Sequence, residues 1–356
     1  MAADIFGERR ERLKALLRRD GLAALLVSLD ANRYYLSGFE LHDTQIDESA
    51  GYLVIMAADR DLLCTDPRFA EAAARLWDKD CIFIYQSKGL EQINALLRDR
   101  VQGNIGFEAA HISLAAFEKL GANLRLVKAD GLVESLRMIK SADETDCLEK
   151  SCRLNHRLMN WLPEVLTPGR SESDIAWDIE KFFREHGAEE MAFPSIVGVN
   201  GNAALPHARP GPDSLVDGCC LLVDTGCRLD GYCSDQTRTF WVGEKADPLF
   251  TSDLEMVQEA QGKAIAMLRP GMAAADVYRV ARAFLEDRGV ADLFTHGLGH
   301  GIGLQTHEAP SLGSSSEQIL RPGMVITVEP GLYRPGRHGV RWEYMVLVTE
   351  DGARTF

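Results

Sequence analysis

Two similar stretches in the second half of the chain limit the folds that it can adopt. Leu166–Gly187 and Leu268–Gly289 are each 22 residues long and are offset by 102 positions. Each has the pattern of a Pro-Gly turn, an N-capped helix and a glycine stop, with a second helix before it and apolar strands after it. Two related units of this kind predict an α+β domain with pseudo-twofold symmetry, in which side chains from both halves can meet at the centre. The alternative is a chance similarity between two amphipathic helices.

The stretch between the two repeats, Leu221–Val242, predicts a β-hairpin that carries two acidic side chains. Its Asp230-Gly231 dipeptide favours a two-residue turn. Strand side chains alternate, so the carboxylates of Asp224 and Asp235 become diagonal neighbours on one face, with backbones roughly 7–8 Å apart. Two acids aimed at one spot repel each other unless one is protonated or a cation bridges them. The alternatives are two solvated aspartates, or a three-residue loop that separates them. The opposite pairs set by a two-residue turn are Leu229 with Tyr232, Asp224 with Thr237, and Asp235 with Gly226.

Composition and charge exclude several classes of function. The 356 residues suggest two domains, and 46% hydrophobic with 26% charged residues is ordinary for a globular protein. The net charge of −14 disfavours nucleic acid as a partner, because phosphate binding needs an excess of lysine and arginine. No apolar run is long enough to span a membrane and the start of the chain has no signal-peptide pattern, so we expect no membrane partner. The eight scattered cysteines predict reduced thiols in a cytoplasmic protein, although a thiolate metal site at Cys227 and Cys233 stays open.

Residues 1–138 are expected to form an α/β domain, because apolar strands alternate with amphipathic helices. The aromatic-rich segment Asn32–Phe39 is expected to pack in the core or else to line a cleft. Ser141 and Glu144 match a capping box that opens a new helix, and residues 139–356 are expected to form the second domain. The predicted strands are Ala23–Leu29, Gly51–Ala57, Leu62–Thr65, Ile82–Tyr85, Asn104–Phe107 and Leu124–Lys128, and the predicted helices are Glu8–Arg19, Phe69–Trp77, Leu90–Arg98 and Leu114–Leu120.

The second half also concentrates histidines and glutamates that could carry chemistry. Taken singly, each histidine is more simply a surface or satisfied core residue, and each glutamate is more simply a solvated one. The segment HGLGHGIGL lacks both the HExxH and the GxGxxG spacing, so it predicts neither a helical zinc site nor a dinucleotide loop. Glu329 is more informative, because it lies in a mostly apolar strand and a buried carboxylate needs a partner or a metal ion. The full set is His207, His296, His300, His307, Glu329 and Glu343.

Together with the hairpin, these residues resemble a known family. The spacings DTG-x8-D and His-x3-His-x6-His are similar to those of the M24 metallopeptidases, in the creatinase/methionine aminopeptidase superfamily. The resemblance implies a catalytic domain of the α+β pita-bread fold, after an amino-terminal α/β domain of the creatinase type that is ribonuclease H-like. Within the family the chain looks like the Xaa-Pro aminopeptidases and Xaa-Pro dipeptidases (prolidases), and its KSADE junction is similar to theirs. The residues that carry the resemblance are Asp224, Asp235, His300, Glu329 and Glu343.

The resemblance implies a centre of two divalent metal ions. Asp224 would chelate one ion, and Asp235 with Glu343 would bridge both. His300 and Glu329 would complete the second. Four carboxylates offset the charge of two divalent cations, and water between such ions ionises near neutral pH. Manganese is the expected metal, while oxygen-rich ligation with one imidazole also suits cobalt, zinc or iron.

The reaction that the resemblance implies is hydrolysis of an Xaa-Pro bond in a peptide with proline at the second position. His307 would stabilise the developing oxyanion, and Glu329 would relay the proton as general base and acid. His207 and His296 would line the proline side of the catalytic site, and Arg341 would contact the substrate. Two alternatives stay open. One is a same-fold enzyme with a non-peptide substrate, such as a creatinase-like C–N hydrolase or a lyase, and the other is a non-catalytic binding module.

The sequence departs from the family beside the last ligand. Tyr344 follows Glu343 where the family commonly has an acidic residue, and Trp342 precedes it where a small aliphatic residue is usual. Neighbouring side chains on a strand point to opposite faces, so Trp342 and Tyr344 point away from the metal ions. We therefore expect the residues that support Glu343 on that side to differ from those of the family. The choice between aminopeptidase and dipeptidase stays open, and a homodimer is expected from the resemblance alone.

Overall fold

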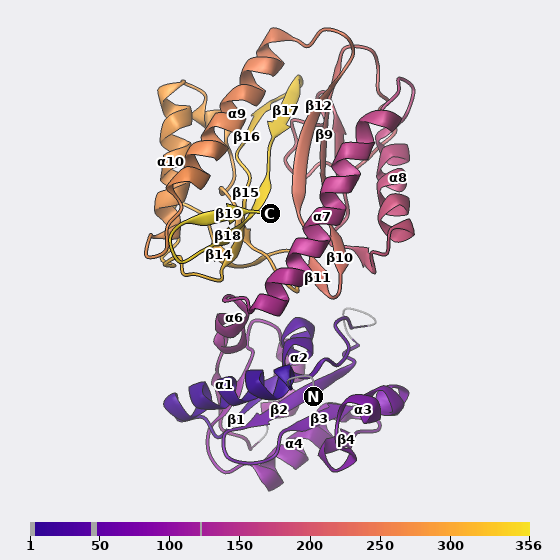
Figure 1. The fold of residues 1–356 in the computed structure, drawn as a ribbon. Helices are drawn as coiled ribbons and strands as arrows, with labels where there is room; N and C mark the ends of the chain where they lie inside the picture. Colours follow the sequence, from indigo (N-terminus) through magenta and orange to yellow (C-terminus); the bar gives the residue numbers. More distant parts are fainter. Residues whose placement is uncertain (1–3, 44–47, 122) are drawn as a thin grey trace. The chain divides into compact units, whose positions relative to one another are not determined.

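The chain divides into two units of contacting residues, Met1–Arg137 and Met138–Phe356. The computed structural model describes residues 4–43, 48–121 and 123–356 (Figure 1). Within that described part, no helix is long and apolar enough to cross a membrane.

The amino-terminal unit is built on one six-stranded mixed sheet with the order β4-β3-β2-β1-β5-β6. Strand β1 runs antiparallel to β2 and parallel to β5. Every strand and helix predicted for this unit is present, which confirms its α/β alternation. The strands are β1 (Ala24–Val27), β2 (Gly51–Met56), β3 (Leu62–Thr65), β4 (Ile82–Ile84), β5 (Ile105–Phe107) and β6 (Leu126–Lys128). The helices are α1 (Ile5–Arg19), α2 (Asp30–Ser37), α3 (Ala70–Leu76), α4 (Gly89–Arg100), α5 (Leu114–Gly121) and α6 (Leu132–Arg137).

Helix α2 is missing from the sequence prediction because polar residues lie on its buried side. Asn32 donates from Nδ2 to Glu108 Oε1 at 2.6 Å, and Arg33 donates from Nη1 to a backbone oxygen of β2 at 2.9 Å. Both residues are fully buried, so the apolar periodicity of a helix is broken. Tyr35 and Phe39 are also fully buried, which confirms core packing for this segment.

The carboxy-terminal unit contains two halves that share a common order of elements. In each half a helix pair is followed by two neighbouring strands of the main sheet, an inserted hairpin and a third strand of that sheet, with one further strand in the first half and two in the second. The first half has α7 (Ala142–Val165), α8 (Glu172–Glu185), β7 (Glu190–Met191), β8 (Ile196–Val199), β9 (Cys219–Thr225), β10 (Cys227–Leu229), β11 (Tyr232–Cys233) and β12 (Gln236–Val242). The second has α9 (Pro248–Met267), α10 (Ala274–Asp287), β13 (His300–Gly301), β14 (Glu308–Ser311), β15 (Val325–Val328), β16 (Gly331–Arg334), β17 (His338–Arg341), β18 (Tyr344–Val348) and β19 (Ala353–Thr355). Their main sheets have the orders β12-β9-β8 and β14-β13-β15-β18-β19.

The entry turns of the two repeats have matching backbone contacts. Gly169 and Gly271 both have positive φ angles, 93° and 87°, and each donates its N–H to a leucine carbonyl at 2.8 Å. The residues two positions later, Ser171 and Ala273, each form an isolated β-bridge. The predicted cap is present only in the first repeat, where Ser171 forms a capping box. In the second, Ala273 has no side chain that can cap, so the prediction of an N-capped helix is wrong there.

The predicted register of the central hairpin is confirmed. Asp230 and Gly231 have φ angles of 50° and 78°, as a two-residue turn of this type requires. The pairing continues past the turn without a shift of register, and an added Cβ at Gly226 would lie 1.8 Å from the backbone oxygen of Ser234, so only glycine fits at that crossing. The observed pairs include Leu229 with Tyr232 and Asp224 with Thr237.

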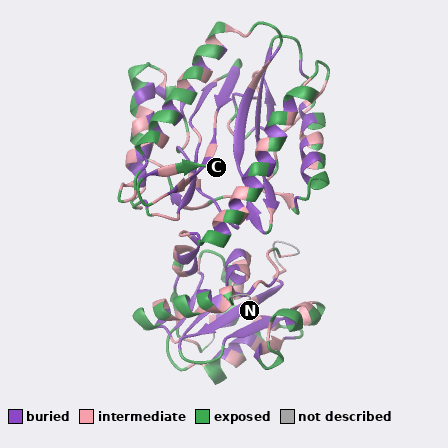
Figure 2. Ribbon diagram, in the orientation of Figure 1, coloured by how far each residue is buried: buried purple, intermediate pink, exposed green. Residues whose placement is uncertain are grey.

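Strand β9 separates two hydrophobic cores. Leu221 and Val223 pack with helices α7 and α8, whereas Cys220 and Leu222 pack with α9 and α10. The strand is therefore buried on both faces, and the helix pairs lie on opposite sides of the central strands, with their outer faces exposed (Figures 1 and 2). Asp224 is on the same face as Cys220 and Leu222, so its carboxylate is directed between the two halves.

A buried carboxylate fastens the β16–β17 hairpin to helix α9. Asp253 accepts hydrogen bonds from Arg334, at 2.6 and 2.8 Å, and from Nε2 of His338 at 2.8 Å. Burial alone would raise the pKa of Asp253, but the hydrogen bonds from these two donors outweigh it, and the pKa lies below its ordinary value.

Replacing Asp253 with asparagine is expected to lower the free energy of unfolding by roughly 3 kcal/mol, because Arg334 loses its carboxylate partner. The pKa of Asp253 is lowered by folding, so its stabilising effect is complete above the ordinary pKa of about 3.9 and is lost as the pH falls through the lower folded-state value. Urea denaturation of both proteins should therefore give a constant difference from about pH 7 to pH 5 and a shrinking one below about pH 4. A difference that grows on acidification would contradict this assignment.

Candidate metal centre

Three of the predicted ligands converge in the carboxy-terminal unit. One ligand atom from each of Asp235, His300 and Glu343 lies within 4.8 Å of the other two. Asp235 directly precedes β12, His300 lies in β13, and Glu343 directly precedes β18. Both acids are buried and His300 is partly buried. Because the residues come from both halves, the group assembles only when the halves pack together.

The other two predicted ligands contact this group. Asp224, in β9, lies close to Asp235: after burial and the charge of Glu343, the charge of Asp224 raises the pKa of the Asp235 carboxyl group further. Glu329 Oε1 lies 3.3 Å from Nε2 of His300, and Asp235 Oδ2 lies 3.7 Å from the same nitrogen. The structure therefore brings all five predicted ligands together. Their individual roles as ligands stay predictions.

The clustered carboxyl groups oppose one another's ionisation. Burial raises the pKa of Asp235 well above its ordinary value, and the charges of Glu343 and Asp224 raise it further. Burial likewise raises the pKa of Glu343, and the charges of Glu329 and Asp224 add to the effect. Without a cation, Asp235 and Glu343 therefore hold their protons more tightly than exposed acids do.

Glu329 and His300 show the opposite behaviour, because they form an ion pair. Burial would raise the pKa of Glu329, but the hydrogen bond and the charge of His300 outweigh it and lower the pKa to about 2. Burial would lower the pKa of His300, but the contact with Glu329 raises it above the ordinary value. Glu329 is therefore ionised at neutral pH.

The donor atoms of this cluster fit divalent cations. Three carboxylate oxygens, Asp224 Oδ1, Asp235 Oδ1 and Glu343 Oε1, are buried and have no hydrogen-bond partner. A buried acceptor without a partner costs about 1–3 kcal/mol, so these atoms favour a cation that would satisfy them and cancel the repulsion. Four carboxylates with one imidazole form an oxygen-rich set that suits manganese, iron, cobalt or zinc.

The three remaining histidines surround the cluster. The ring of His307 lies against that of His300, with centroids 4.2 Å apart. His207 lies on an exposed turn. Burial lowers the pKa of both His296 and His307. His296 contacts Gly297 O through Nδ1 at 2.7 Å and Tyr333 Oη through Nε2 at 2.8 Å. Their predicted roles toward a substrate stay predictions.

Arg341 is fully engaged with the protein around Asp224. It is buried and donates to Asp224 Oδ2 at 2.7 Å, to Tyr333 Oη at 2.6 Å and to Thr237 Oγ1 at 3.0 Å. Thr237 also donates to Glu343 Oε2 at 2.8 Å. Thr237 and Tyr333 were not among the site residues predicted from the sequence. The register pointed to Thr237, which lies opposite Asp224, whereas nothing in the sequence singled out Tyr333.

The aromatic residues on either side of Glu343 enclose a buried arginine. The guanidinium carbon of Arg238 lies 4.3 Å from the ring centroids of both Trp342 and Tyr344. Arg238 also donates to the backbone oxygens of Glu343, at 2.6 Å, and Thr237, at 2.8 Å. The two residues that depart from the family pattern, Trp342 and Tyr344, thus both place a ring against this cation.

Replacing Trp342 with valine is expected to lower the free energy of unfolding by about 3 kcal/mol, because a desolvated cation–π contact of roughly 2 kcal/mol is lost together with buried apolar area. Trp177, on α8, is 64% exposed and serves as the matched control. Trp177→Val should change the value by less than about 0.5 kcal/mol. Equal effects of the two substitutions in chemical denaturation would show that the stacked arginine contributes nothing.

The thiolate alternative at the hairpin turn is not supported. Burial raises the pKa of Cys227 to about 12 and that of Cys233 to about 11, so both remain thiols. Cys233 Sγ donates to Leu304 O, and Cys227 Sγ lies 3.5 Å from Ser234 Oγ.

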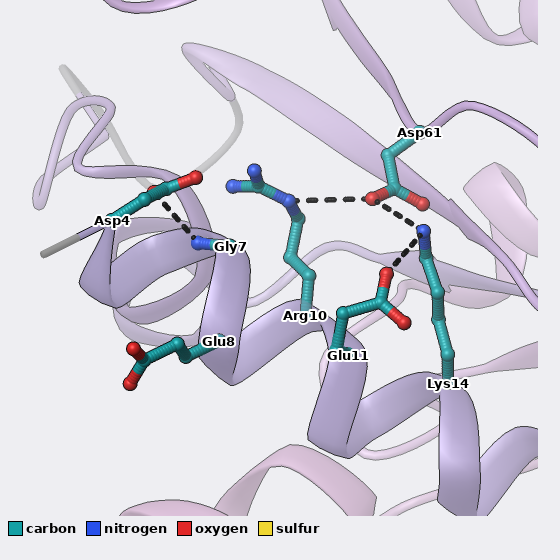
Figure 3. Close-up of a pocket in the computed structure, with 7 residues that line it drawn as sticks. All are labelled: Asp4, Gly7, Glu8, Arg10, Glu11, Lys14 and Asp61. Atoms are coloured by element: carbon teal, nitrogen blue, oxygen red, sulfur yellow. Dashed lines mark hydrogen bonds and ion pairs between the residues drawn. The ribbon is translucent and has the colours of Figure 1, made fainter.

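A cavity on the amino-terminal unit has a different character (Figure 3). Asp61 projects into it and pairs with Arg10 at 3.3 Å and with Lys14 at 3.2 Å, while Lys14 also pairs with Glu11 at 3.1 Å. Four of its six charged side chains are joined in these ion pairs, and none of the predicted site residues lines it. We therefore assign the function to the carboxylate–histidine cluster and not to this cavity.

Comparison with known proteins agrees with this geometry. The profile described as "Metallopeptidase family M24" matches residues 146–350, a span that contains the whole cluster. The chain belongs to metallopeptidase family M24. A second profile, "Creatinase/Prolidase N-terminal domain", matches residues 9–139 of this M24 metallopeptidase.

Relatives of this M24 metallopeptidase match along nearly their whole length. The "Uncharacterized peptidase YqhT" of Bacillus subtilis is 33% identical over 97% of this chain and 96% of its own. The "Xaa-Pro dipeptidase" of Pyrococcus furiosus is 30% identical over 98% of this chain and 97% of its own. A solved structure described as "Xaa-Pro dipeptidase from Bacillus anthracis" superposes with a TM-score of 0.91 at 29% identity, over 98% of this chain and 97% of that one. The predicted fold class, a creatinase-type domain followed by a pita-bread catalytic domain, is confirmed.

Proposed function

We propose that this M24 metallopeptidase is an Xaa-Pro dipeptidase (prolidase). The observation that carries the proposal is the buried cluster of Asp235, His300 and Glu343, with Asp224 and Glu329 in contact with it. The similar proteins from P. furiosus and B. anthracis are both described as Xaa-Pro dipeptidases. The Xaa-Pro aminopeptidase activity is the alternative within the same chemistry.

In this proposal the cluster holds two divalent metal ions, with manganese as the expected metal. Asp224, Asp235, His300, Glu329 and Glu343 would hold the ions. When bound, the ions polarise the scissile carbonyl and lower the pKa of attacking water toward neutrality. Arg341 supports the cluster through its 2.7 Å hydrogen bond to Asp224.

Glu329 and His307 are assigned the proton transfer and the charge stabilisation. Glu329 is ionised at neutral pH, so it can take a proton from water and deliver it to the leaving imide nitrogen. That nitrogen has no N–H and needs the proton to leave as an amine. The His307 ring, beside His300, is placed to donate a hydrogen bond to the oxygen on which charge develops.

His207 and His296 are assigned to the proline side of the substrate. Tyr333 Oη accepts from Arg341, so its own proton is directed to His296 Nε2, while Nδ1 of His296 donates to Gly297 O. Both ring nitrogens are then used, and His296 presents a neutral ring face. Such a face suits the apolar ring of proline.

The proposal also includes the domain bounds, the cellular location and the oligomeric state. Residues 1–138 form the creatinase-type domain and residues 139–356 form the catalytic domain. The eight free cysteines support a cytoplasmic location, because thiols stay reduced there. Likeness to the family supports a homodimer, for which light scattering at micromolar concentration is the measurement.

The deciding experiment compares Ala-Pro with Ala-Pro-Ala as substrates. The protein is stripped with a chelator, reloaded with Mn²⁺ and assayed for released alanine. Cleavage of Ala-Pro alone supports the dipeptidase, whereas cleavage of the tripeptide would make the enzyme an Xaa-Pro aminopeptidase. Metal-dependent activity on neither peptide would contradict the proposal and favour a non-peptide C–N substrate. A purified protein that binds no metal would favour a binding module.

A further inference from the structure

The KSADE junction contributes a buried cation to the neighbourhood of the cluster. Lys140, directly before helix α7, places Nζ 3.2 Å from Oε2 of Glu308. The exposed fractions of the two side chains are 1% and 6%, so the ion pair is removed from water. The backbone N–H of Lys140 is also held, by the oxygen of Gly323 at 2.8 Å. The two charges are 168 positions apart in the sequence and lie in the same unit.

The carboxylate of Glu308 fills the inside of the turn that carries His307. Its Oε1 accepts the backbone N–H of Gln305 at 3.1 Å, which closes the turn from Gln305 to Glu308. A Cβ added to Gly303 would lie 2.7 Å from both oxygens of this carboxylate, so the carboxylate lies close against Gly303. Glu308 also pairs with Gly301, the neighbour of the predicted ligand His300.

The residues before and after His307 in the sequence are both held by side-chain contacts. On one side Thr306 donates from Oγ1 to Ala192 O at 3.1 Å, and on the other side Glu308 is paired with Lys140. Among the described residues the His307 ring contacts His300 but makes no hydrogen bond, so its ring nitrogens are open to a substrate. The backbone of the turn sets where the His307 side chain starts, and the only aromatic ring that its own ring contacts in the described part of the chain is that of His300.

We propose that the Lys140–Glu308 ion pair positions His307 for catalysis. Lys140 and Glu308 are positioning residues, because they act through the turn and do not touch the substrate. The inference rests on the proposed function for the role of His307. It adds that the domain junction supplies one of the supports of the catalytic site.

A double-mutant cycle with His307 tests this proposal. Lys140→Met keeps most of the side-chain volume and removes the charge. With Ala-Pro as substrate we expect kcat to fall about 10–100-fold, since a displacement of about 1 Å can cost 10²-fold. In a His307→Ala background the same change should lower kcat by less than about 2-fold, because the turn then carries nothing to position. Equal factors in both backgrounds would overturn the proposal.

Two further measurements separate positioning from a general structural role. Mn²⁺ affinity by calorimetry should stay within about 2-fold of the wild type, since neither residue is assigned to the metal. Amide hydrogen exchange at residues 304–308 should become at least about 10-fold faster in Lys140→Met, and unchanged exchange would overturn the proposal. This readout decides the inference even if the wild type cleaves no Xaa-Pro peptide, which would refute the proposed function alone.

Suitable controls keep the test informative if Lys140→Met does not fold. The doubly neutral variant, Lys140→Met with Glu308→Gln, leaves no unpaired buried charge and retains an acceptor for Gln305. For this double variant we expect the same two results as for Lys140→Met. Its kcat should fall about 10–100-fold when His307 is present, and less than about 2-fold in the His307→Ala background. Lys150→Met is the matched control, because Lys150 lies on helix α7, which follows Lys140, in an exposed pair with Asp230. It should leave kcat unchanged.

Discussion

Asp235→Asn is expected to lower kcat/KM for Ala-Pro by on the order of 10³-fold or more, because Asp235 is assigned to both metal ions. The substitution keeps the size of the side chain but removes a negative charge and one oxygen donor. Asp235 is buried, in contact with Asp224 and 3.7 Å from His300, so no water can replace the lost donor without rearrangement. Steady-state hydrolysis with saturating Mn²⁺ measures the effect.

The matched control is Asp230→Asn, five residues earlier in the same hairpin. Asp230 is exposed, it pairs only with exposed Lys150 among the described contacts, and its positive φ suits asparagine. Its kcat/KM should stay within about 2-fold of the wild type.

A measurement of the melting temperature excludes a loss of activity through unfolding. Metal-free Asp235→Asn should melt no lower than the metal-free wild type, because one member of the repelling cluster has been neutralised. Wild-type activity in Asp235→Asn would overturn the assignment.

Removal and return of the metal is expected to change stability as well as activity. An ion at a hundred times its Kd stabilises the folded state by about 2.7 kcal/mol, which corresponds to about 5–10 °C in Tm for a unit of this size. The buried oxygens of Asp224, Asp235 and Glu343 that have no hydrogen-bond partner are the physical source of this gain. Differential scanning fluorimetry of stripped protein titrated with Mn²⁺ gives the shift.

The same titration on the two hairpin variants locates the binding. Asp230→Asn should show the full rise in Tm, and Asp235→Asn should show less than about half of it. A full rise in Asp235→Asn would place the metal elsewhere in the protein. No rise in the wild type, up to millimolar Mn²⁺, would contradict a metal centre in this cluster.

The parts of the site that the sequence predicts are those set by local rules. A two-residue turn at Asp230 determines every pair along the hairpin, because strand side chains alternate. The meeting of Asp224 with Asp235 therefore follows from short-range geometry, and the structure confirms the pairing of Asp224 with Thr237. The remaining ligands entered only through the resemblance, since no local rule brings Glu329 beside His300.

The parts that the sequence does not predict depend on contacts across long separations. Helix α2 is obscured because Asn32 and Arg33 are buried for hydrogen bonds that only the folded unit supplies. The residues that support Glu343 were expected to differ from those of the family. The form of that support, Arg238 against the rings of Trp342 and Tyr344, needs strands β12 and β18 of two different sheets to lie near each other. The Lys140–Glu308 pair joins positions 168 residues apart, and no sequence periodicity marks such a pair.

The division of the proposed ligands between the two halves would make the metal a removable crosslink. The first half contains Asp224 and Asp235, and the second contains His300, Glu329 and Glu343. If the chain were cut between β12 and α9, each fragment would hold an incomplete ligand set, and the ions would join the fragments as a clasp that a chelator can open. In a cell, the supply of metal would then govern how long a folded molecule lasts as well as how fast it works.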